Sequence, residues 1–270
     1  MKKISFIGAG SMAEAVIAGI VHKKVFKQED VYVINKENKE RLQFMQDTYG
    51  VNGSTNREEV VRKADILVIA TKPYDVEVAL QEIAPFVKED QLIISVVAGI
   101  STMIIEDSLK ENIAVIRTMP NTSATIGYSA TAICKGKYAT DTHLKEAKRL
   151  FEAIGTVSVV EEEQMHIVTG ISGSGPAYFY YIVEAMEKAA IEEGLDHTTA
   201  KQLITQTIIG AGKMLAERPE SPAQLRENVT SPNGTTAAGL ATLDQHNVKN
   251  AIVNCVKSAT RRSEELGKKD

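Results

Sequence analysis

The sequence predicts an α/β protein in which a doubly wound sheet at residues 1–160 is followed by an all-helical domain at residues 161–270. Two observations predict this fold class. Short apolar runs alternate with helical patterns up to about residue 160, which is typical of a mainly parallel sheet with helices on both faces. After Glu161-Glu162-Glu163 the pattern changes, and only helical segments follow.

The first strand is expected at residues 3–7, and the turn Gly8-Ala9-Gly10-Ser11-Met12-Ala13 follows it directly. A helix with apolar residues at a spacing of three and four comes next. Strand, G-x-G-x-x-A and helix in this order form the dinucleotide-binding fingerprint of a Rossmann-like fold, whereas the glycines alone would indicate only a turn. Gly8 allows the tight turn, and Gly10 lets a pyrophosphate approach the backbone.

The second strand is expected at residues 31–34 and ends at Asn35-Lys36. An NAD enzyme usually carries an acidic residue here, against the ribose 2′-hydroxyl. A neutral amide followed by a cation suits a 2′-phosphate instead, so the sequence favours NADPH, with NADH possible. The alternative is that Lys36 is simply a solvated residue at the start of the next helix.

Further strands are expected at residues 66–70 and 92–97, because both are continuous apolar runs. They lead into Thr71-Lys72-Pro73-Tyr74 and Ala98-Gly99 at the carboxyl edge of the sheet, where doubly wound folds bind ligands. Lys72 is equally well explained as a surface lysine. Later strands at residues 114–117, 129–134 and 156–160, with a helix at 144–154, complete this part. Between the first two of them, Met119-Pro120-Asn121-Thr122 is either a loop that meets substrate or an ordinary turn.

The helical part begins after Ser172-Gly173-Ser174-Gly175-Pro176, with Pro176 suited to a first helical turn and Gly194 to a stop. Asp196 is expected to cap a second helix that reaches about residue 217. Two more helices are expected at residues 235–246 and 248–266. Small apolar residues on these helices allow close approach, and apolar faces on several sides predict a homo-oligomer, either a dimer or an assembly of dimers.

Composition excludes several classes of protein. The net charge is −4 and no basic block stands out, which argues against a nucleic-acid surface. The cysteines Cys134 and Cys255 lie in apolar runs, as core residues do in a reducing compartment. The five histidines show no metal-ligand spacing, and no segment is long enough to span a membrane. We expect a cytoplasmic protein without a metal and without a membrane or nucleic-acid partner.

The most informative segment is Val229-Thr230-Ser231-Pro232-Asn233-Gly234-Thr235-Thr236, a polar turn that leads into a helix. Pro232 and the Asn233-Gly234 pair favour a tight turn. The backbone N–H groups of Gly234, Thr235 and Thr236 are expected to be unpaired at the helix start, which suits a carboxylate. Hydroxyls of Ser231, Thr235 and Thr236 add donors. A plain helix cap with solvent-exposed hydroxyls is the alternative.

Taken together, G-A-G-S-M-A, A-T-K-P, M-P-N-T, S-G-S-G-P-A-Y and T-S-P-N-G-T-T-A-A-G-L resemble the pyrroline-5-carboxylate reductases over essentially the whole chain. That family reduces a cyclic imine to L-proline with NAD(P)H. The resemblance implies a Rossmann-like domain, a helical oligomerisation domain that exchanges between subunits, and a pocket for pyrroline-5-carboxylate or proline. It implies substrate contacts from Asn228, Ser231, Gly234, Thr235 and Thr236. It also implies contacts with the cofactor, in addition to those predicted above from the strand ends. The predicted cofactor-binding residues are together Ile7, Gly8, Ala9, Gly10, Ser11, Met12, Asn35, Lys36, Asn56, Ala70, Thr71, Lys72, Pro73, Val96, Val97 and Ala98.

The resemblance also implies that the Thr236 hydroxyl hydrogen-bonds to the ring nitrogen of the substrate and positions it or relays a proton. The sequence departs from the family pattern in two places. Asn233 stands where a second glycine is usual, and Asn tolerates a positive φ. His166-Ile167 stand where Asp-Ala is common, which affects local packing or a contact one layer away from the site.

Two other functions compete with this one. A β-hydroxyacid dehydrogenase would carry a lysine in G-x-G-x-x-x-K at the start of the long helix, and here Phe179 stands at that position. A non-catalytic NADP-binding regulator would keep the fold without the reaction, and the complete set of substrate-loop residues argues against it.

Overall fold

The computed structural model describes residues 2–36, 38–109 and 112–267. Contacts within the chain define two compact units. The first comprises Met1–Pro176 together with Lys257–Asp270, and the second comprises Ala177–Val256. Each unit is described by itself.

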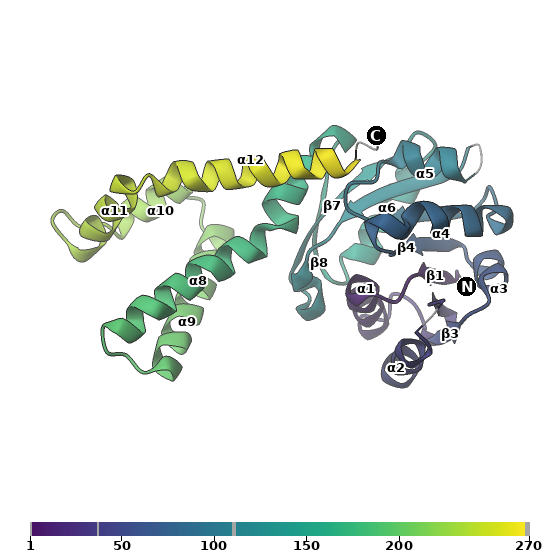
Figure 1. The fold of residues 1–270 in the computed structure, drawn as a ribbon, viewed down its shortest axis with the longest axis horizontal. Coiled ribbons are helices and arrows are strands. Elements are labelled where there is room, and N and C mark those ends of the chain that lie inside the picture. Colours follow the sequence, from purple (N-terminus) through teal and green to yellow (C-terminus); the bar gives the residue numbers. More distant parts are fainter. Residues whose placement is uncertain (1, 37, 110–111, 268–270) are drawn as a thin grey trace. The chain divides into compact units, whose positions relative to one another are not determined.

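The first unit contains an eight-stranded sheet with the order β3-β2-β1-β4-β5-β6-β7-β8 (Figure 1). Its strands are β1 (Ile4–Ile7), β2 (Val31–Ile34), β3 (Asn52–Ser54), β4 (Ile66–Ile69), β5 (Leu92–Ser95), β6 (Ala114–Met119), β7 (Ser129–Lys135) and β8 (Gly155–Val159). All neighbours pair in parallel except β6 and β7. The order from β3 to β6 is that of the Rossmann fold, which confirms the predicted fold class.

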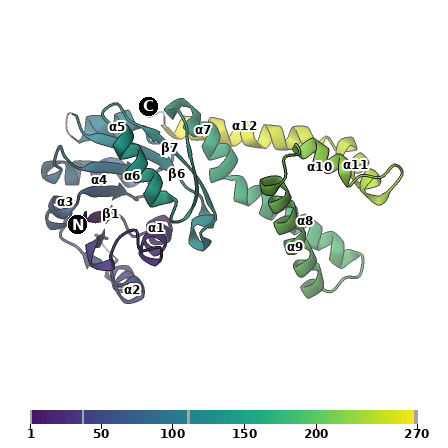
Figure 2. The ribbon, with the colours of Figure 1, turned by 180° about the vertical axis from the view of Figure 1, so that it is seen from behind.

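Helices connect the strands and lie on both faces of the sheet, which Figures 1 and 2 show from opposite sides. They are α1 (Ser11–His22), α2 (Lys39–Tyr49), α3 (Arg57–Lys63), α4 (Val76–Ile83), α5 (Thr102–Ser108), α6 (Asp141–Phe151) and α7 (Met165–Val168). Short helical turns occupy Gln28–Asp30, Pro73–Asp75, Ala84–Phe86, Thr122–Ile126 and Glu162–Gln164, and Thr169–Gly173 forms a π-helix.

Alternate residues of each strand contribute to two separate apolar clusters. In β1, Ile4 and Phe6 pack in one cluster with α1, α2 and α6, while Ile7 packs in the other with α3, α4 and α5. This alternation follows from the two-residue period of a strand, and it leaves β1 without exposure on either face. The sheet is therefore packed on both faces at β1, and the turn after this strand starts from the core.

Residues beyond the last strand still pack on this sheet. Met165 is fully buried in a third apolar cluster with Ala132 and Cys134 of β7. The buried Arg117 pairs with Glu162, with 3.2 Å between Nη1 and Oε1. The first unit therefore extends to Pro176, past the boundary at residues 160/161 that the sequence predicts for the domains. Apolar patterning locates the end of the last strand but does not show which later residues contact the sheet.

The C-terminal end of α12 (Val248–Gly267) also belongs to the first unit. Ser263 is buried, and its Oγ lies 3.0 Å from Nδ1 of His166. A Cβ placed on Gly267 would come within 2.5 Å of the Gly99 carbonyl oxygen, so the helix end lies close to the turn after β5. His166, one of the two departures from the family pattern, thus forms a hydrogen bond with the C-terminal part of α12.

The second unit contains helices only, and in the part of the chain described here no strand follows β8. Besides residues 248–256 of α12 it holds α8 (Gly175–Glu192), α9 (His197–Glu217), α10 (Pro222–Asn228) and α11 (Thr235–Gln245). Asp196 caps α9 as predicted, since its carboxylate accepts a hydrogen bond from the Thr199 N–H at 3.0 Å. Helix α10 was not expected, although Ser221 as a cap followed by Pro222 is a helix-start signal.

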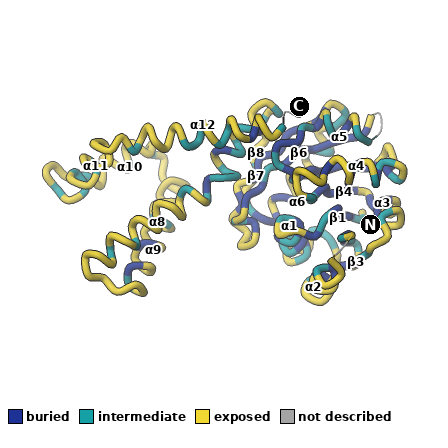
Figure 3. Tube along the Cα trace, in the orientation of Figure 1, coloured by how far each residue is buried: buried dark blue, intermediate teal, exposed yellow. Residues whose placement is uncertain are grey.

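Most residues of the second unit are exposed, as Figure 3 shows by their yellow colour. Large apolar side chains are among them, including Phe179, Tyr180, Tyr181, Ile182, Leu203, Ile209, Leu215, Ile252 and Val253. So much exposed apolar surface indicates an interface with another chain. None of the described helices is both long and apolar enough to cross a membrane.

Candidate dinucleotide and substrate sites

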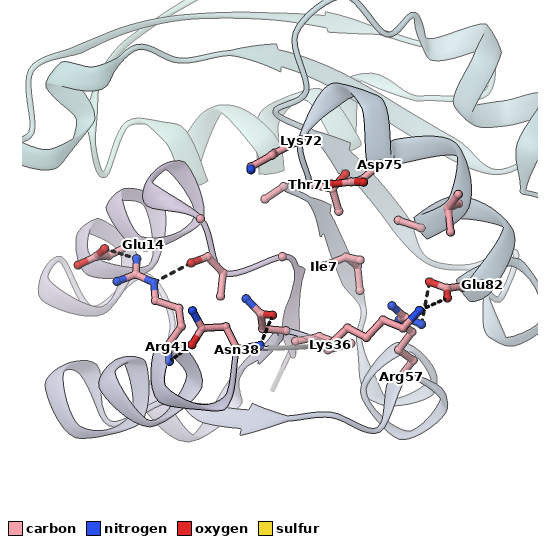
Figure 4. A pocket seen from close by; sticks show the side chains of 18 of the residues that line it. Ile7, Glu14, Lys36, Asn38, Arg41, Arg57, Thr71, Lys72, Asp75 and Glu82 are labelled. Atoms are coloured by element: carbon pink, nitrogen blue, oxygen red, sulfur yellow. Dashed lines mark hydrogen bonds and ion pairs between the residues drawn. The ribbon is translucent and has the colours of Figure 1, made fainter.

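A cavity of about 630 Å³ opens at the carboxyl ends of β1, β2 and β4 (Figure 4). It is lined by Ile7, Gly8, Ala9, Gly10, Ser11, Glu14, Ile34, Asn35, Lys36, Asn38, Arg41, Arg57, Ala70, Thr71, Lys72, Asp75, Val78, Ala79 and Glu82. Strand order reverses between β1 and β4, and this reversal is where a doubly wound sheet binds its ligand.

The two glycines of the first turn have different geometry. Gly8 has φ of +114°, and a Cβ there would lie 2.5 Å from the carbonyl oxygen of Ala70. Its N–H donates to the Ile34 carbonyl at 3.1 Å, which ties the turn to the end of β2. Gly10 has an ordinary φ of −72°, and a Cβ there would meet no described atom within 4 Å. Gly8 is therefore required for the turn itself, whereas Gly10 keeps the cavity open.

Arg41 of α2 supports this turn from one side (Figure 4). Its Nε donates to the Ala9 carbonyl at 2.8 Å, and its Nη2 pairs with the Glu14 carboxylate. Tyr49 donates to the same carboxylate at 2.8 Å. Burial opposes the charge on Glu14, but the hydrogen bonds from Arg41 and Tyr49 outweigh it and lower the pKa of Glu14. Burial, and then the bond to Glu14, raise the pKa of Tyr49 to about 12.

Two cations meet one carboxylate beyond the end of β2. Lys36 Nζ lies 3.1 Å from Glu82 Oε1, and Arg57 Nη1 lies 2.7 Å from Glu82 Oε2. The side chain of Lys36 is 61% exposed, those of Arg57 and Glu82 only 23% and 29%. Both cations outweigh the effect of partial burial on Glu82 and lower its pKa. This end of the cavity thus has two positive groups and one negative group.

The side-chain amides of Asn35 and Asn56 accept hydrogen bonds from the backbone at the starts of α2 and α3. Asn35 Oδ1 accepts from the Asn38 N–H at 3.0 Å, and Asn56 Oδ1 caps α3 by accepting from the Glu59 N–H at 3.2 Å.

At the end of β4, Thr71 Oγ1 is buried and has no hydrogen-bond partner among the described residues. Lys72 lies beside Tyr74, which raises the pKa of the lysine. The Thr71 hydroxyl is therefore available to hydrogen-bond with water or with a ligand group in the cavity.

Ten of the sixteen predicted cofactor residues line the cavity, namely Ile7, Gly8, Ala9, Gly10, Ser11, Asn35, Lys36, Ala70, Thr71 and Lys72. Met12, Asn56, Pro73, Val96, Val97 and Ala98 do not line it. The sequence interpretation missed Glu14, Arg41, Arg57 and Glu82, because α2, α3 and α4 bring the last three to the cavity by tertiary packing. Arg57 directly follows the predicted Asn56, and that adjacency was the one available signal.

The cavity fits a dinucleotide. Gly10 leaves the space that a pyrophosphate needs beside the N-terminus of α1. Lys36 and Arg57 can attract a phosphate on the ribose, and Thr71 offers an unused hydroxyl.

The predicted substrate turn lies in the second unit and precedes α11. Asn233 has φ of +59°, so asparagine takes the left-handed conformation that a glycine would take more easily. One expectation is wrong: the Gly234 N–H is not free, because it donates to the Ser231 carbonyl at 3.0 Å. The N–H groups of Thr235 and Thr236 have no partner among the described residues, and no described side chain caps α11.

Asn228 ends α10, and its Oδ1 accepts from Gln224 Nε2 at 3.1 Å. A hollow of about 370 Å³ in this unit is lined by Arg226, Glu227, Thr230, Leu240, Asp244 and Lys249. It includes none of the five predicted substrate residues. In the described chain no three His, Cys, Asp or Glu side chains are grouped so that they could hold a metal ion.

Two family models match the chain. Residues 162–266 match the model described as pyrroline-5-carboxylate reductase dimerisation, and residues 3–99 match the model described as NADP oxidoreductase coenzyme F420-dependent.

Similar proteins cover nearly the full length. Pyrroline-5-carboxylate reductase 1 of Bacillus spizizenii is 46% identical over 98% of this chain and 89% of its own. The pyrroline-5-carboxylate reductase of Methanosarcina acetivorans is 40% identical over 99% of both chains. Among solved structures, a pyrroline-5-carboxylate reductase from Coxiella burnetii has a TM-score of 0.92 at 31% identity over 99% of both chains. The Plasmodium falciparum pyrroline carboxylate reductase with NADP bound has a TM-score of 0.90 at 30% identity, over 99% of this chain and 98% of that one.

Proposed function

The chain belongs to the pyrroline-5-carboxylate reductase family, and we propose that it reduces 1-pyrroline-5-carboxylate to L-proline with NADPH, the last step of proline biosynthesis. The observation that carries the proposal is the cavity at the first glycine turn, in a chain that is similar to these reductases along its whole length. Lys36 and Arg57 lie at the end of this cavity beyond β2, where the adenosine ribose would bind.

Different residues around the cavity would bind different parts of NADPH. The Gly8–Ser11 turn and the N-terminus of α1 would bind the pyrophosphate. Asn35, Lys36 and Arg57 would hold the adenosine ribose and its 2′-phosphate, which supports NADPH over NADH as the preferred cofactor. Ala70, Thr71 and Lys72 line the cavity at the end of β4. We keep Met12, Asn56, Pro73 and the Val96-Val97-Ala98 turn as proposed contacts, although they lie outside this cavity.

The turn before α11 would bind the substrate. Unpaired N–H groups of Thr235 and Thr236 at a helix start, together with the Ser231 hydroxyl and Asn228, suit the carboxylate. The Gly234 N–H is no donor for the substrate, because it already donates to the Ser231 carbonyl. Gly234 contributes space instead, since a Cβ there would lie against Ser231 Oγ. The Thr236 hydroxyl would hydrogen-bond to the ring nitrogen.

When bound, the reduced nicotinamide supplies a hydride. A protonated cyclic imine is already a strong electrophile, so the reaction as proposed requires neither a metal nor a nucleophile. What remains for the protein is to hold the imine in an aligned pose and to satisfy the charge on the ring nitrogen. A threonine hydroxyl is a weak acid, so Thr236 acts first as a positioning group.

The homo-oligomer is supported by the dimerisation model at residues 162–266. We propose a dimer or an assembly of dimers that buries exposed apolar residues of α8, such as Phe179 and Tyr181. Light scattering of wild type and Phe179→Glu tests the assembly. A monomeric wild type with full activity would contradict it.

We also propose a functional division into residues 1–160 and 161–270 and an absence of nucleic-acid partners. We propose a cytoplasmic location as well, which the free Cys134 and Cys255 support.

The test of the function is NADPH oxidation with pyrroline-5-carboxylate, followed by detection of L-proline, with and without a chelator. We expect equal turnover in both conditions. Turnover that a chelator abolishes and added metal restores would refute the metal-free reaction. Binding of NADPH without turnover would favour a regulator instead, and oxidation of a β-hydroxyacid would favour the dehydrogenase that Phe179 argues against.

A further inference from the structure

Among the described residues, Glu82 is the carboxylate that contacts both Lys36 and Arg57 at the end of the cavity beyond β2. Its two oxygens are divided between them, with Oε1 on Lys36 Nζ at 3.1 Å and Oε2 on Arg57 Nη1 at 2.7 Å (Figure 4). All three side chains line the cavity. Groups that would bind a 2′-phosphate are thus already paired with an anion of the protein.

The position of Glu82 is fixed by its helix. Its neighbours Leu80 and Ile83 on α4 are fully buried in the core, as Ala79 nearly is. Lys36 follows β2, and Arg57 begins α3, so three separate elements meet at this carboxylate. Arg41, a third cation of the cavity, contacts the Ala9 carbonyl and Glu14 and therefore supports the glycine turn.

A dianionic phosphate placed between Lys36 and Arg57 would compete with Glu82 for the same N–H donors. It would also lie close to a negative charge, which opposes its binding. Both effects act on the 2′-phosphate and leave a ligand that lacks this group nearly unaffected.

We propose that Glu82 is a specificity-determining residue which competes with the cofactor 2′-phosphate for Lys36 and Arg57 and so limits the preference for NADPH over NADH. This inference rests on the proposed function only in that the cavity binds an NADPH-type nucleotide. Its consequence is that neutralising Glu82 strengthens binding of 2′-phosphorylated ligands selectively.

The experiment measures binding, not turnover. Titration calorimetry at pH 8 and low salt gives the affinities of 2′,5′-ADP and of 5′-ADP for wild type and Glu82→Gln. We expect 2′,5′-ADP to bind about five- to tenfold more tightly to the variant, and 5′-ADP to change less than about twofold. Glu58→Gln is the matched control, because Glu58 is a paired carboxylate of α3 that does not line the cavity. It should leave both affinities unchanged.

A second set of variants separates competition from simple repulsion. If Glu82 competes for the cations, its effect should depend on them. Adding Glu82→Gln to a protein that already carries Lys36→Gln and Arg57→Gln should then give no gain in affinity for 2′,5′-ADP. A gain that persists there, an equal gain for 5′-ADP, or weaker binding of 2′,5′-ADP to Glu82→Gln would overturn the proposal. If neither nucleotide bound to the wild type, the cofactor site itself would be wrong, which is a different failure.

Discussion

The side-chain amide of Asn121 donates to the backbone carbonyl of Ser172 at 3.0 Å and so joins the M-P-N-T loop to the S-G-S-G-P segment. Asn121 is only 8% exposed, and its Oδ1 accepts from the Ser123 N–H at 3.1 Å. Ser172 lies in the π-helix Thr169–Gly173. The Asn121 amide therefore links two motifs, and the two bonded residues are 51 positions apart in the sequence.

Asn121→Asp should destabilise the protein, because it replaces the donor to Ser172 with a second acceptor. Opposing two acceptors in a nearly buried site should reduce the free energy of unfolding by about 1–3 kcal/mol. Urea denaturation at fixed protein concentration measures it, with the exposed neighbour Thr122→Ala as a control that should lie near wild type. Equal stability of Asn121→Asp and wild type would show that the contact contributes nothing.

Gly10→Ala should abolish cofactor binding without destabilising the fold. Its φ of −72° suits alanine, and the added Cβ would point into open space that a pyrophosphate needs. Gly8→Ala should lose both cofactor binding and stability. The alanine would have to adopt φ of +114° and would clash with Ala70, which should lower the free energy of unfolding by roughly 1–3 kcal/mol or more. NADPH fluorescence titration beside denaturation distinguishes the two. Normal NADPH affinity in Gly10→Ala would place the pyrophosphate elsewhere.

Asn35→Asp should weaken NADPH binding by about tenfold and NADH binding much less, through repulsion of the 2′-phosphate. The variant should fold normally, since an aspartate oxygen can still accept from the Asn38 N–H. Dissociation constants for both cofactors provide the measurement, and a melting curve provides the control. Comparable affinities for both cofactors in the wild type, unchanged in the variant, would refute the role of Asn35.

The framework of this fold follows from apolar patterning, while the details of its site depend on tertiary contacts. Strands β1, β2, β4 and β5 are short apolar runs, and each was predicted within one or two residues. Strand β3 is Asn52-Gly53-Ser54, which has no apolar pattern and forms an edge strand only because β2 lies beside it. Glu82 and Arg57 meet at the cavity for the same reason: nothing in the local sequence brings α3 and α4 together. Similarly, the free N–H expected at Gly234 is used by Ser231, because a tight turn closes on its own backbone.

Glu106 should make the stability depend on pH. It is 9% exposed, and its Oε1 has no hydrogen-bond partner among the described residues. Burial raises the pKa of this carboxyl, against the opposing effect of the Lys137 and Tyr138 backbone N–H groups. The unfolded chain therefore releases this proton at lower pH than the folded protein does, and this contribution to stability is lost as pH rises through the raised pKa.

Glu106→Gln removes that titration, so the free energy of unfolding of the variant relative to wild type should increase between pH 4.5 and pH 8. Urea denaturation at both pH values tests this, with the exposed Glu58→Gln as a comparison that should show no such trend. A difference between variant and wild type that stays constant with pH would mean that Glu106 keeps an ordinary pKa in the fold.

The Thr236 hydroxyl allows the sharpest test of the substrate turn. Thr236→Ala should lower kcat more than it raises the KM for pyrroline-5-carboxylate, if the hydroxyl meets the ring nitrogen mainly in the transition state. Ser231→Ala should chiefly raise KM, because a carboxylate contact acts in the ground and transition states alike. Each lost hydrogen bond to a charged group should cost roughly 1.5–3 kcal/mol, about ten- to a hundredfold. Both variants should bind NADPH normally.

The competing explanation makes Thr236 a helix cap, whose removal would cost about 1 kcal/mol of stability and nothing in catalysis. The structure provides a reason to doubt it, since Gly234 is the residue at the cap of α11 and no described side chain hydrogen-bonds there. Thr242→Ala is the matched control, because Thr242 lies on the same helix and donates to the Ala238 carbonyl at 3.3 Å. Steady-state kinetics beside melting curves decide between the explanations. A lowered melting temperature with intact kcat in Thr236→Ala would leave a structural role only, whereas an unchanged melting temperature with reduced kcat would place the hydroxyl at the reacting nitrogen.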